Sequence, residues 1–264
     1  MKTDICFFDI DGTLISHTTK EMPESTKKSL RALRAKGIET WIATGRPRPF
    51  LPEFEPGLFS GILSSNGQVL EHEGKRFSVV TLSPEAVAGL IKNAEKEGIP
   101  FVAGTPDAAF NVFGSSDALV RYCGQVDRYH PIKPEELVKL PVTQVCAGIN
   151  WQEADKLIGN VDGADATWWC DWGIDIIPKG AGKDAGVRGA LEYLHLSADN
   201  AMAFGDGVND IPMLKACKTG VAMGNAQEEV FPEANYITDT LEEDGLAKAL
   251  VHFGVLSEEE AGLV

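Results

Sequence analysis

The stretch Phe7-Phe8-Asp9-Ile10-Asp11-Gly12-Thr13, close to the start of the chain, decides the fold and points to the chemistry. It has the form of an apolar strand that ends on two carboxylates with one residue between them. Side chains on a strand alternate in direction, so Asp9 and Asp11 leave its end on the same side. Two carboxylates held so close repel each other unless a cation or a shared proton relieves them. Burying this pair without a partner would cost several kcal/mol, so a functional site is the better interpretation.

Composition limits the functions that the chain can have. Its 264 residues are 44% hydrophobic, which is enough for a substantial core in one large domain or two. Acidic residues outnumber basic ones by 39 to 24, giving a net charge of −15, which argues against nucleic-acid binding and against attraction to anionic membranes. An anionic substrate would therefore need positive charge concentrated locally at its binding site.

Cysteine usage and hydropathy indicate where the protein works. The five cysteines are scattered and show no CxxC spacing, so we expect a reducing cytoplasm and neither a disulfide framework nor a zinc site. No apolar run reaches the roughly 18 residues that a membrane span needs, and no signal-like segment precedes the first strand. We predict a soluble, cytoplasmic protein that binds neither nucleic acid nor membrane. The sequence does not indicate its oligomeric state.

Alternating helices and strands follow the opening strand. A helix with Leu30 and Leu33 on one face should end near Gly37, and buried strands are predicted over 38–43 and 61–63. Polar segments follow these two strands, Thr44-Gly45-Arg46 after the first and Ser64-Ser65-Asn66-Gly67 after the second. This arrangement is typical of a doubly wound parallel sheet, in which ligands bind outside the carboxyl ends of the strands.

The middle of the chain is richer in predicted hairpins than its two ends. Segments 68–70 and 77–80 indicate a hairpin, and Ser83-Pro84 has the form of a helix start before a helix over 85–97. Further helices are expected near Glu135 and Trp151. Short strands are predicted at 99–103, 110–113, 142–149, 166–170 and 174–177. Together these elements form an α+β pattern.

The alternating pattern resumes at Lys183. The chain continues with a helix to His195, a strand over 201–204, the turn Gly205-Asp206-Gly207-Val208-Asn209-Asp210, a helix through Leu214, a strand at 221–222 and a closing helix over 243–253. We therefore predict an α/β protein with a doubly wound, Rossmann-like parallel-sheet core made of residues 1–80 and 179–264. Residues 81–178 are predicted to form an inserted α+β domain.

Four of these segments together resemble the motifs of the haloacid dehalogenase (HAD) superfamily of phosphotransferases. The run from Asp9 to Thr13 is similar to the first motif, Thr44 to the second, Lys183 to the third and segment 205–210 to the fourth. Other segments narrow the resemblance to the Cof-like sugar-phosphatase branch, namely Ala43-Thr44-Gly45-Arg46, Ser65-Asn66-Gly67, Lys179-Gly180-Ala181-Gly182-Lys183, Val221-Ala222-Met223-Gly224-Asn225-Ala226 and Glu243-Asp244-Gly245. The insertion, about 100 residues long, lies where that branch carries its type C2 (C2B) cap. The resemblance spans essentially the whole chain.

The resemblance implies a Mg²⁺-dependent phosphatase that hydrolyses small phosphorylated metabolites, such as sugar phosphates, through an aspartyl-phosphate intermediate. Asp9 matches the nucleophile, which splits one difficult hydrolysis into two easier steps. Asp11 matches the general acid and base that protonates the leaving alkoxide and then activates water. Thr44 and Lys183 would hold the phosphoryl group, with Lys183 supplying the positive charge that an acidic protein needs at this site.

The same resemblance implies a metal site and further substrate contacts. Asp9, the backbone carbonyl of Asp11 and Asp206 look like the protein ligands of Mg²⁺, which prefers an octahedral oxygen shell completed by waters and phosphate. Asp210 and Asn66 would support the site. For Arg46, a place beside Thr44 favours a contact with substrate or cap, and a salt bridge is nearly as good an interpretation. The expected substrate-binding residues are Thr44, Gly45, Arg46, Lys183 and Asn209.

Two other functions fit the same residues. A sugar phosphomutase shares the core chemistry and returns the phosphoryl group to a sugar, and the motifs alone do not separate it from a phosphatase. A receiver-like signalling domain also holds an aspartyl phosphate with acidic residues, a Thr and a Lys. Such a domain would need neither Asp11 placed to activate water nor a cap, so the phosphatase is the favoured interpretation.

A few conspicuous residues lie outside the motifs. Trp168, Trp169 and Trp172 crowd the end of the insertion, and their alternating spacing favours packing over stacking on a substrate. The five histidines show no metal-ligand spacing and are not expected to be catalytic. In the insertion, the loop Cys170-Asp171-Trp172 is the candidate for substrate contact, because it lies just ahead of the return to the core.

Overall fold

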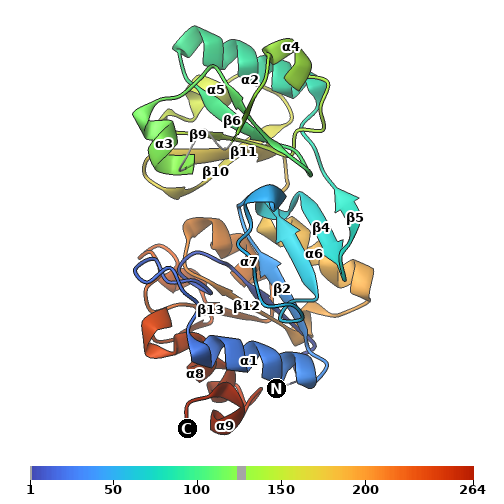
Figure 1. The fold of residues 1–264 in the computed structure, drawn as a ribbon, viewed down its shortest axis with the longest axis vertical. Helices are drawn as coiled ribbons and strands as arrows, with labels where there is room; N and C mark the ends of the chain where they lie inside the picture. Colours follow the sequence, from blue (N-terminus) through green and yellow to red (C-terminus); the bar gives the residue numbers. More distant parts are fainter. Residues whose placement is uncertain (1, 124–128) are drawn as a thin grey trace.

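The computed structural model describes residues 2–123 and 129–264, which form two sheets, one above the other in Figure 1. The larger sheet has the order β14-β13-β12-β1-β2-β3-β4-β5, and the smaller has the order β10-β11-β9-β6-β7-β8. The strands of the larger sheet are β1 (Ile5–Phe8), β2 (Glu39–Ala43), β3 (Gly61–Ser64), β4 (Val69–His72), β5 (Lys75–Val79), β12 (Ala201–Gly205), β13 (Thr219–Ala222) and β14 (Tyr236–Ile237). Those of the smaller sheet are β6 (Phe101–Gly104), β7 (Ala109–Val112), β8 (His130–Pro131), β9 (Gln144–Ala147), β10 (Ala164–Cys170) and β11 (Gly173–Pro178).

The larger sheet is parallel except at one edge. Strands β14 through β3 run parallel, and the hairpin β4-β5 adds two antiparallel strands beyond β3. The opening strand β1 lies in the middle, between β12 and β2. Phe7 packs on one face of the sheet and Phe8 on the other, and both are fully buried. A continuous apolar run is what a parallel strand needs when helices cover both of its faces.

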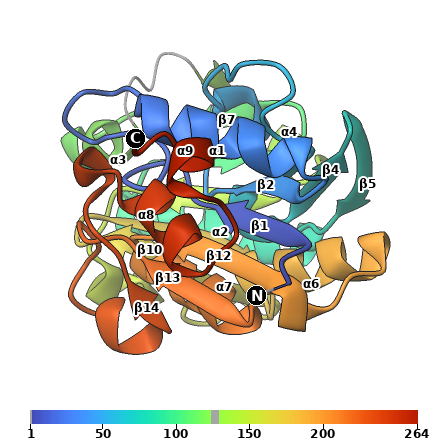
Figure 2. The same ribbon diagram turned by 90° about the horizontal axis from the view of Figure 1, so that it is seen from below.

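Helices cover both faces of the larger sheet (Figure 2). One face packs against α1 (Glu24–Ala35), α8 (Gly245–His252) and α9 (Glu258–Ala261), through side chains such as Leu30 and Leu250. The other face packs against α6 (Lys183–Leu194) and α7 (Ile211–Ala216), through side chains such as Val187 and Leu214. These elements come from both ends of the chain, so the core is assembled across the insertion.

The smaller sheet forms a cap over the carboxyl-end edge of the larger one (Figure 1). Its far face packs against α2 (Pro84–Glu97), α4 (Pro134–Leu137) and α5 (Asp155–Ile158). The near face carries Cys146, Cys170 and Tyr129, with α3 (Asp117–Cys123) beside them. The apolar helices cover only the far face of the cap sheet, so the side chains on its near face point toward the core.

The structure confirms the predicted fold class, an α/β core with a second sheet as a cap, and the predicted hairpin is β4-β5. The predicted strand over 142–149 is only β9, and the helix near Trp151 is a 3-10 turn, Trp151–Glu153, followed by the single turn of α5. Phe113, with φ 63°, lies outside β7 and not within the predicted strand. Helices α3 and α9 were not predicted. The exact domain limits of 81 and 178 stay a prediction.

Both ends of α2 follow the local signals in the sequence. The Ser83 side chain accepts a hydrogen bond from the backbone N–H of Ala86, and Gly98 ends the helix with φ 66°. A capping hydroxyl and a left-handed glycine satisfy backbone groups that a helix end leaves unpaired. Among the described residues, no helix has the length and apolar character needed to cross a membrane.

Candidate active site

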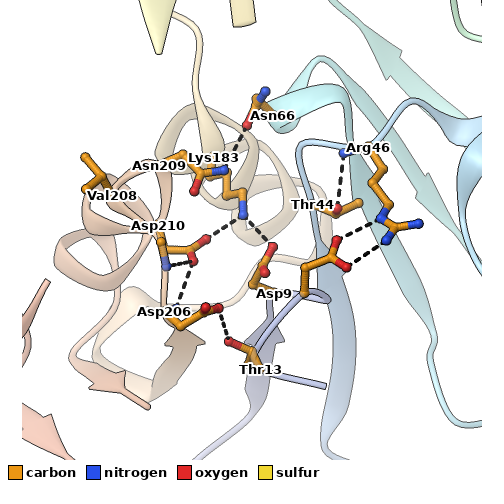
Figure 3. Close-up of polar contacts among 12 residues, drawn as sticks. Asp9, Thr13, Thr44, Arg46, Asn66, Lys183, Asp206, Val208, Asn209 and Asp210 are labelled. Carbon is orange, nitrogen blue, oxygen red and sulfur yellow. Dashed lines mark hydrogen bonds and ion pairs between the residues drawn. The ribbon is translucent and has the colours of Figure 1, made fainter. Parts of the chain in front are cut away.

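The polar segments predicted from the sequence meet at one edge of the larger sheet (Figure 3). Asp9 directly follows β1, Thr44 follows β2, and Asp206 follows β12. These three strands are neighbours and parallel, so their carboxyl ends lie side by side. Lys183 reaches the same place as the first residue of α6. The structure therefore brings together side chains that lie up to about 200 residues apart in the sequence.

Lys183 lies at the centre of this arrangement. Its Nζ donates to Oδ1 of Asp9 at 2.7 Å and to Oδ1 of Asp210 at 2.5 Å, and the residue is 1% exposed. Burial disfavours the ammonium, but the Asp210 and Asp9 carboxylates outweigh it and raise the pKa of Lys183. Burial likewise raises the pKa of Asp9 well above its usual range, although Lys183 opposes this. Lys183 is thus a permanent cation that fixes one oxygen of Asp9.

Three buried carboxylates form a cluster around the edge of β1 and β12. Each of Asp9, Asp206 and Asp210 offers an oxygen that lies within 4.8 Å of the others. Oδ1 of Asp206 accepts a hydrogen bond of 3.0 Å from the Thr13 hydroxyl. Such a set of oxygen donors, with no thiolate or imidazole among the three, fits a hard divalent cation such as Mg²⁺.

Asp210 holds the loop that carries Asp206. Its Oδ2 accepts hydrogen bonds from the backbone N–H groups of Asp206 and Gly207, at 3.0 and 2.9 Å. Because its Oδ1 accepts from Lys183, both of its oxygens are engaged. Its place fits the supporting role predicted for it, and Asp9 and Asp206 are better placed as direct ligands.

Gly12 is required by the close approach of Asp206 to the loop after β1. Its φ is 87°, in the left-handed region, and a Cβ at this position would lie 2.2 Å from Oδ2 of Asp206. Any other residue would clash with the carboxylate and strain the backbone. The glycine that separates Asp11 from Thr13 therefore makes room for the acidic cluster.

Asp11 and Arg46 form a two-pronged ion pair beside the cluster. Nε and Nη2 of Arg46 donate to the two oxygens of Asp11 at 2.8 and 2.7 Å. The backbone N–H of Arg46 donates to the Thr44 hydroxyl at 3.1 Å, and its Nη1 donates to the carbonyl of Phe50 at 3.2 Å. Of the two interpretations of Arg46, the structure thus shows the salt bridge, and its partner is the predicted acid and base.

Asn66 and Asn209 extend the site toward the cap. Nδ2 of Asn209 donates to Oδ1 of Asn66 at 3.4 Å (Figure 3). Gly45 lies beside them, since a Cβ on it would lie 3.1 Å from Oδ1 of Asn66. The core residues named from the sequence therefore lie at the carboxyl ends of these strands, and their functional roles stay predictions.

A cavity of about 780 Å³ lies between this edge and the cap. Asp9, Asp11, Arg46 and Asn209 line its core side. The predicted loop Cys170-Asp171-Trp172 lines its cap side, and Trp172 is 40% exposed with the Arg121 guanidinium 5.1 Å from its ring centre. The cavity can therefore hold a phosphate ester whose leaving group reaches into the cap.

The tryptophans of the insertion divide between packing and the cavity. Trp168 stacks on Trp151 with ring centres 5.4 Å apart and packs on the far face of the cap, as its spacing predicted. Trp172 lines the cavity and so departs from the packing prediction. The side chain of Trp169 lies outside the described part of the structure.

Sequence reasoning missed several residues that line the cavity, among them His17, Gln144 and Asp175. His17 has its Nε2 3.7 Å from Oδ2 of Asp206, whose carboxylate raises the pKa of His17. His17 thus lies at the site, and the expectation that the histidines are not catalytic stays a prediction. Gln144 and Asp175 line the cavity from β9 and β11. A signal for Asp175 was present, since an acidic residue stands there between Ile174 and Ile176 in an otherwise apolar strand.

The geometry can now be compared with known proteins. Residues 6–250 match the family of haloacid dehalogenase-like hydrolases. The chain belongs to this family. The predicted superfamily is thus confirmed, and this haloacid dehalogenase-like hydrolase is a phosphatase that acts on phosphorylated small molecules.

Individual relatives of the phosphatase match over nearly its whole length. YkrA of Bacillus subtilis is 31% identical over 264 residues, which cover 97% of this chain and 100% of YkrA. The 5-amino-6-(5-phospho-D-ribitylamino)uracil phosphatase YcsE of the same organism is 29% identical, over 93% of each chain. The solved structure of the HAD subclass IIB sugar phosphatase BT4131 superposes with a TM-score of 0.89 at 29% identity, covering 96% of this chain and 100% of that one. The Cof-like, capped branch is thereby confirmed.

Proposed function

We propose that this phosphatase hydrolyses sugar phosphates and similar small phosphomonoesters through an aspartyl phosphate on Asp9, with Mg²⁺ as its metal. The observation that carries the proposal is the position of Lys183, which holds one oxygen of Asp9 and leaves the other to attack phosphorus. The Asp206 carboxylate beside it would supply an oxygen donor for the metal, and Asp210 holds the loop that carries Asp206. Nucleophile, fixed cation and metal ligands thus lie within one small volume, as phosphoryl transfer requires.

In this proposal the two carboxylates after β1 have different roles: Asp9 attacks phosphorus and Asp11 transfers protons. Asp9 forms the new P–O bond as the leaving oxygen departs, and Asp11 gives a proton to that oxygen. Asp11 then takes a proton from the water that attacks the aspartyl phosphate, which releases inorganic phosphate and restores Asp9. Both oxygens of Asp11 accept from Arg46, so at least one of these bonds must loosen when the proton moves.

Asp9, Asp206 and the backbone carbonyl of Asp11 would hold Mg²⁺, with Asp210 fixing the loop of Asp206. The cation would neutralise the charge of the phosphoryl oxygens. Thr44, Lys183 and Asn209 donate to the phosphoryl group in this proposal, with Gly45 leaving space for it. Arg46 holds Asp11 through its guanidinium and also lines the cavity.

The cavity and the relatives support polyhydroxylated leaving groups. Its cap side offers the exposed Asp171 carboxylate and the Trp172 ring, which suit hydroxyl groups and the apolar face of a sugar. BT4131 is named as a sugar phosphatase, and the substrate of YcsE carries a phosphorylated ribityl chain. The direct test is phosphate release with Mg²⁺ from a panel of sugar phosphates, nucleotides and pyridoxal phosphate, with a bisphosphorylated sugar added separately to reveal mutase activity. If the protein released phosphate from none of these compounds, the proposal would be overturned.

The metal proposal predicts that chelation abolishes activity and that Mg²⁺ restores it. Asp206→Asn should raise the Mg²⁺ concentration for half-maximal rate by at least about tenfold, because a neutral amide binds the cation less well than a carboxylate. The matched control is Asp239→Asn, since Asp239 pairs with Lys248 at the surface. Full activity of the wild-type protein in excess chelator would contradict the metal-dependent mechanism.

The role of Asp11 predicts a dependence on the leaving group. Asp11→Asn should lower the rate for alkyl phosphates by about 10²–10⁴-fold, because an alkoxide leaves poorly without a proton. An aryl phosphate needs little protonation, so its first step should survive and phosphoenzyme should accumulate. Rapid quenching and intact mass spectrometry would detect the adduct. Equal losses for both substrate types, with no adduct, would assign Asp11 another role.

A further inference from the structure

The turn that follows β3 is strained and buried. Ser65, Asn66 and Gly67 have consecutive left-handed φ values of 52°, 53° and 94°, and Asn66 is 1% exposed. Left-handed backbone is costly for residues other than glycine, so it persists where the surroundings enforce it, often at functional sites. A Cβ on Gly67 would lie 2.4 Å from the carbonyl oxygen of Gly182, just before Lys183. The turn therefore packs against the segment that ends at Gly182, and the Asn66 side chain points toward the cap.

The Asn66 amide joins the core to the cap. Its Nδ2 donates to Oδ2 of Asp175 at 2.9 Å and to Oε1 of Gln144 at 3.2 Å, both in the cap. Its Oδ1 accepts from Nδ2 of Asn209 in the core. Gln144 makes a second connection, because its Nε2 donates to the backbone carbonyl of Gly45 at 2.9 Å.

The two bonds that Nδ2 of Asn66 donates to the cap are buried. Gln144 is 0% exposed and Asp175 4% exposed. Buried polar groups need their partners, and a hydrogen bond to a charged carboxylate is stronger than one between neutral groups. The amide can donate to Asp175 and accept from Asn209 at the same time only when the cap rests on the core. The geometry thus couples the position of the cap to that of the loop carrying Asn209.

We propose that Asn66 is a positioning residue that latches the closed cap through Asp175 and thereby sets Asn209 and the Gly45 carbonyl at the phosphate site. The inference rests on the proposed phosphatase function for its kinetic consequences, whereas the latch itself is a property of the free protein. Without the latch the closed state becomes a smaller fraction of the molecules, and apparent substrate affinity falls in proportion.

The test replaces the donor with an acceptor of the same shape. Asn66→Asp places a carboxylate against the Asp175 carboxylate at neutral pH, which should open the cap. We expect a larger radius of gyration in solution X-ray scattering and a KM for the best sugar phosphate at least about tenfold higher, because open molecules lack the cap contacts. The left-handed backbone is compatible with Asp, so the variant should fold.

A second substitution distinguishes a latch from a general structural defect. Asn66→Asp with Asp175→Asn restores a donor and an acceptor with their roles exchanged. Compared with Asn66→Asp alone, this double variant should have a smaller radius of gyration and a KM at least about threefold lower. The matched control is Asn66→Asp with Asp171→Asn, which removes the same charge from the cap side of the cavity without restoring the bond. We expect no recovery in that control.

Several outcomes would overturn the latch. It fails if Asn66→Asp keeps the wild-type radius and KM, or if Asp171→Asn rescues as well as Asp175→Asn does. Should Asn66→Asp not fold, Asp175→Ala removes the same bond from the cap side and must raise both the radius and KM. If the wild-type protein hydrolyses no phosphomonoester, the proposed function fails, and the scattering comparison still decides whether the latch exists.

Discussion

Asp9→Asn is expected to abolish turnover while the protein stays folded. The amide keeps the shape of the carboxylate but cannot attack phosphorus, and it weakens the metal cluster with Asp206 and Asp210. By analogy with the removal of other nucleophiles, kcat should fall by about 10⁴-fold or more. Phosphate release measures the rate, and circular dichroism with thermal unfolding measures the fold.

Two controls make the Asp9 result interpretable. Asp199→Asn changes an exposed acid far from the site and should leave the rate unchanged. Intact mass spectrometry must show that the Asn at position 9 has not deamidated to Asp, which would restore trace activity. A verified, folded Asp9→Asn protein with substantial turnover would exclude the covalent mechanism and leave direct attack by water as the alternative.

Lys183→Met should lower both activity and stability. Lys183 holds Asp9 and Asp210 in a buried site, and its loss leaves those carboxylates without their cation. Breaking a buried ion pair from one side typically costs about 3–5 kcal/mol of unfolding free energy. Loss of the positive charge beside the phosphoryl group should lower kcat/KM by about 10²-fold or more. Denaturant unfolding and initial rates measure the two effects.

The stability effect of Lys183→Met has a predicted pH dependence. Burial already raises the pKa of Asp9, and removal of Lys183 would raise it further. When a carboxyl group has a raised pKa in the folded state, the protein loses stability as the pH rises through that folded-state pKa. The difference in the free energy of unfolding between Lys183→Met and the wild type should therefore become smaller as the pH falls.

The control for Lys183→Met is Lys248→Met, because Lys248 pairs with Asp239 at the surface. An exposed pair of this kind contributes little to stability, because water screens the two charges. If both variants lost equally little stability, the ion pairs of Lys183 would be far weaker than their burial implies.

Most of the core could be predicted from the sequence because its signals are local. The run ending at Asp9 and Asp11 shows an apolar strand and its carboxyl end together, and the same holds for the strand before Thr44. In a parallel sheet those ends must meet, so the site follows from the order of the elements. Lys183 was assigned to the site by its resemblance to the third motif of the family, since a lysine at a helix start is by itself a weak signal.

The cap was harder to predict than the core. Its strands are short, and tertiary contacts set their lengths, as the contraction of the strand predicted over 142–149 to β9 shows. Helix α3 has only seven residues, too few for a clear apolar period. Which face of the cap meets the core depends on where α2, α4 and α5 pack, and this is a property of the assembled domain.

The sequence by itself determined the parallel core and the approximate place of the insertion, because apolar strands and the polar residues that follow them are local features. The resemblance of its motifs to a known family pointed to the acidic residues of the site. Only the tertiary structure decided which partner each polar group takes. Arg46 stands beside Thr44 in the sequence yet pairs with Asp11, and Asn66 reaches Asp175 across 109 positions. Such pairings depend on the distances between groups after the cap has folded onto the core, and no local pattern records those distances.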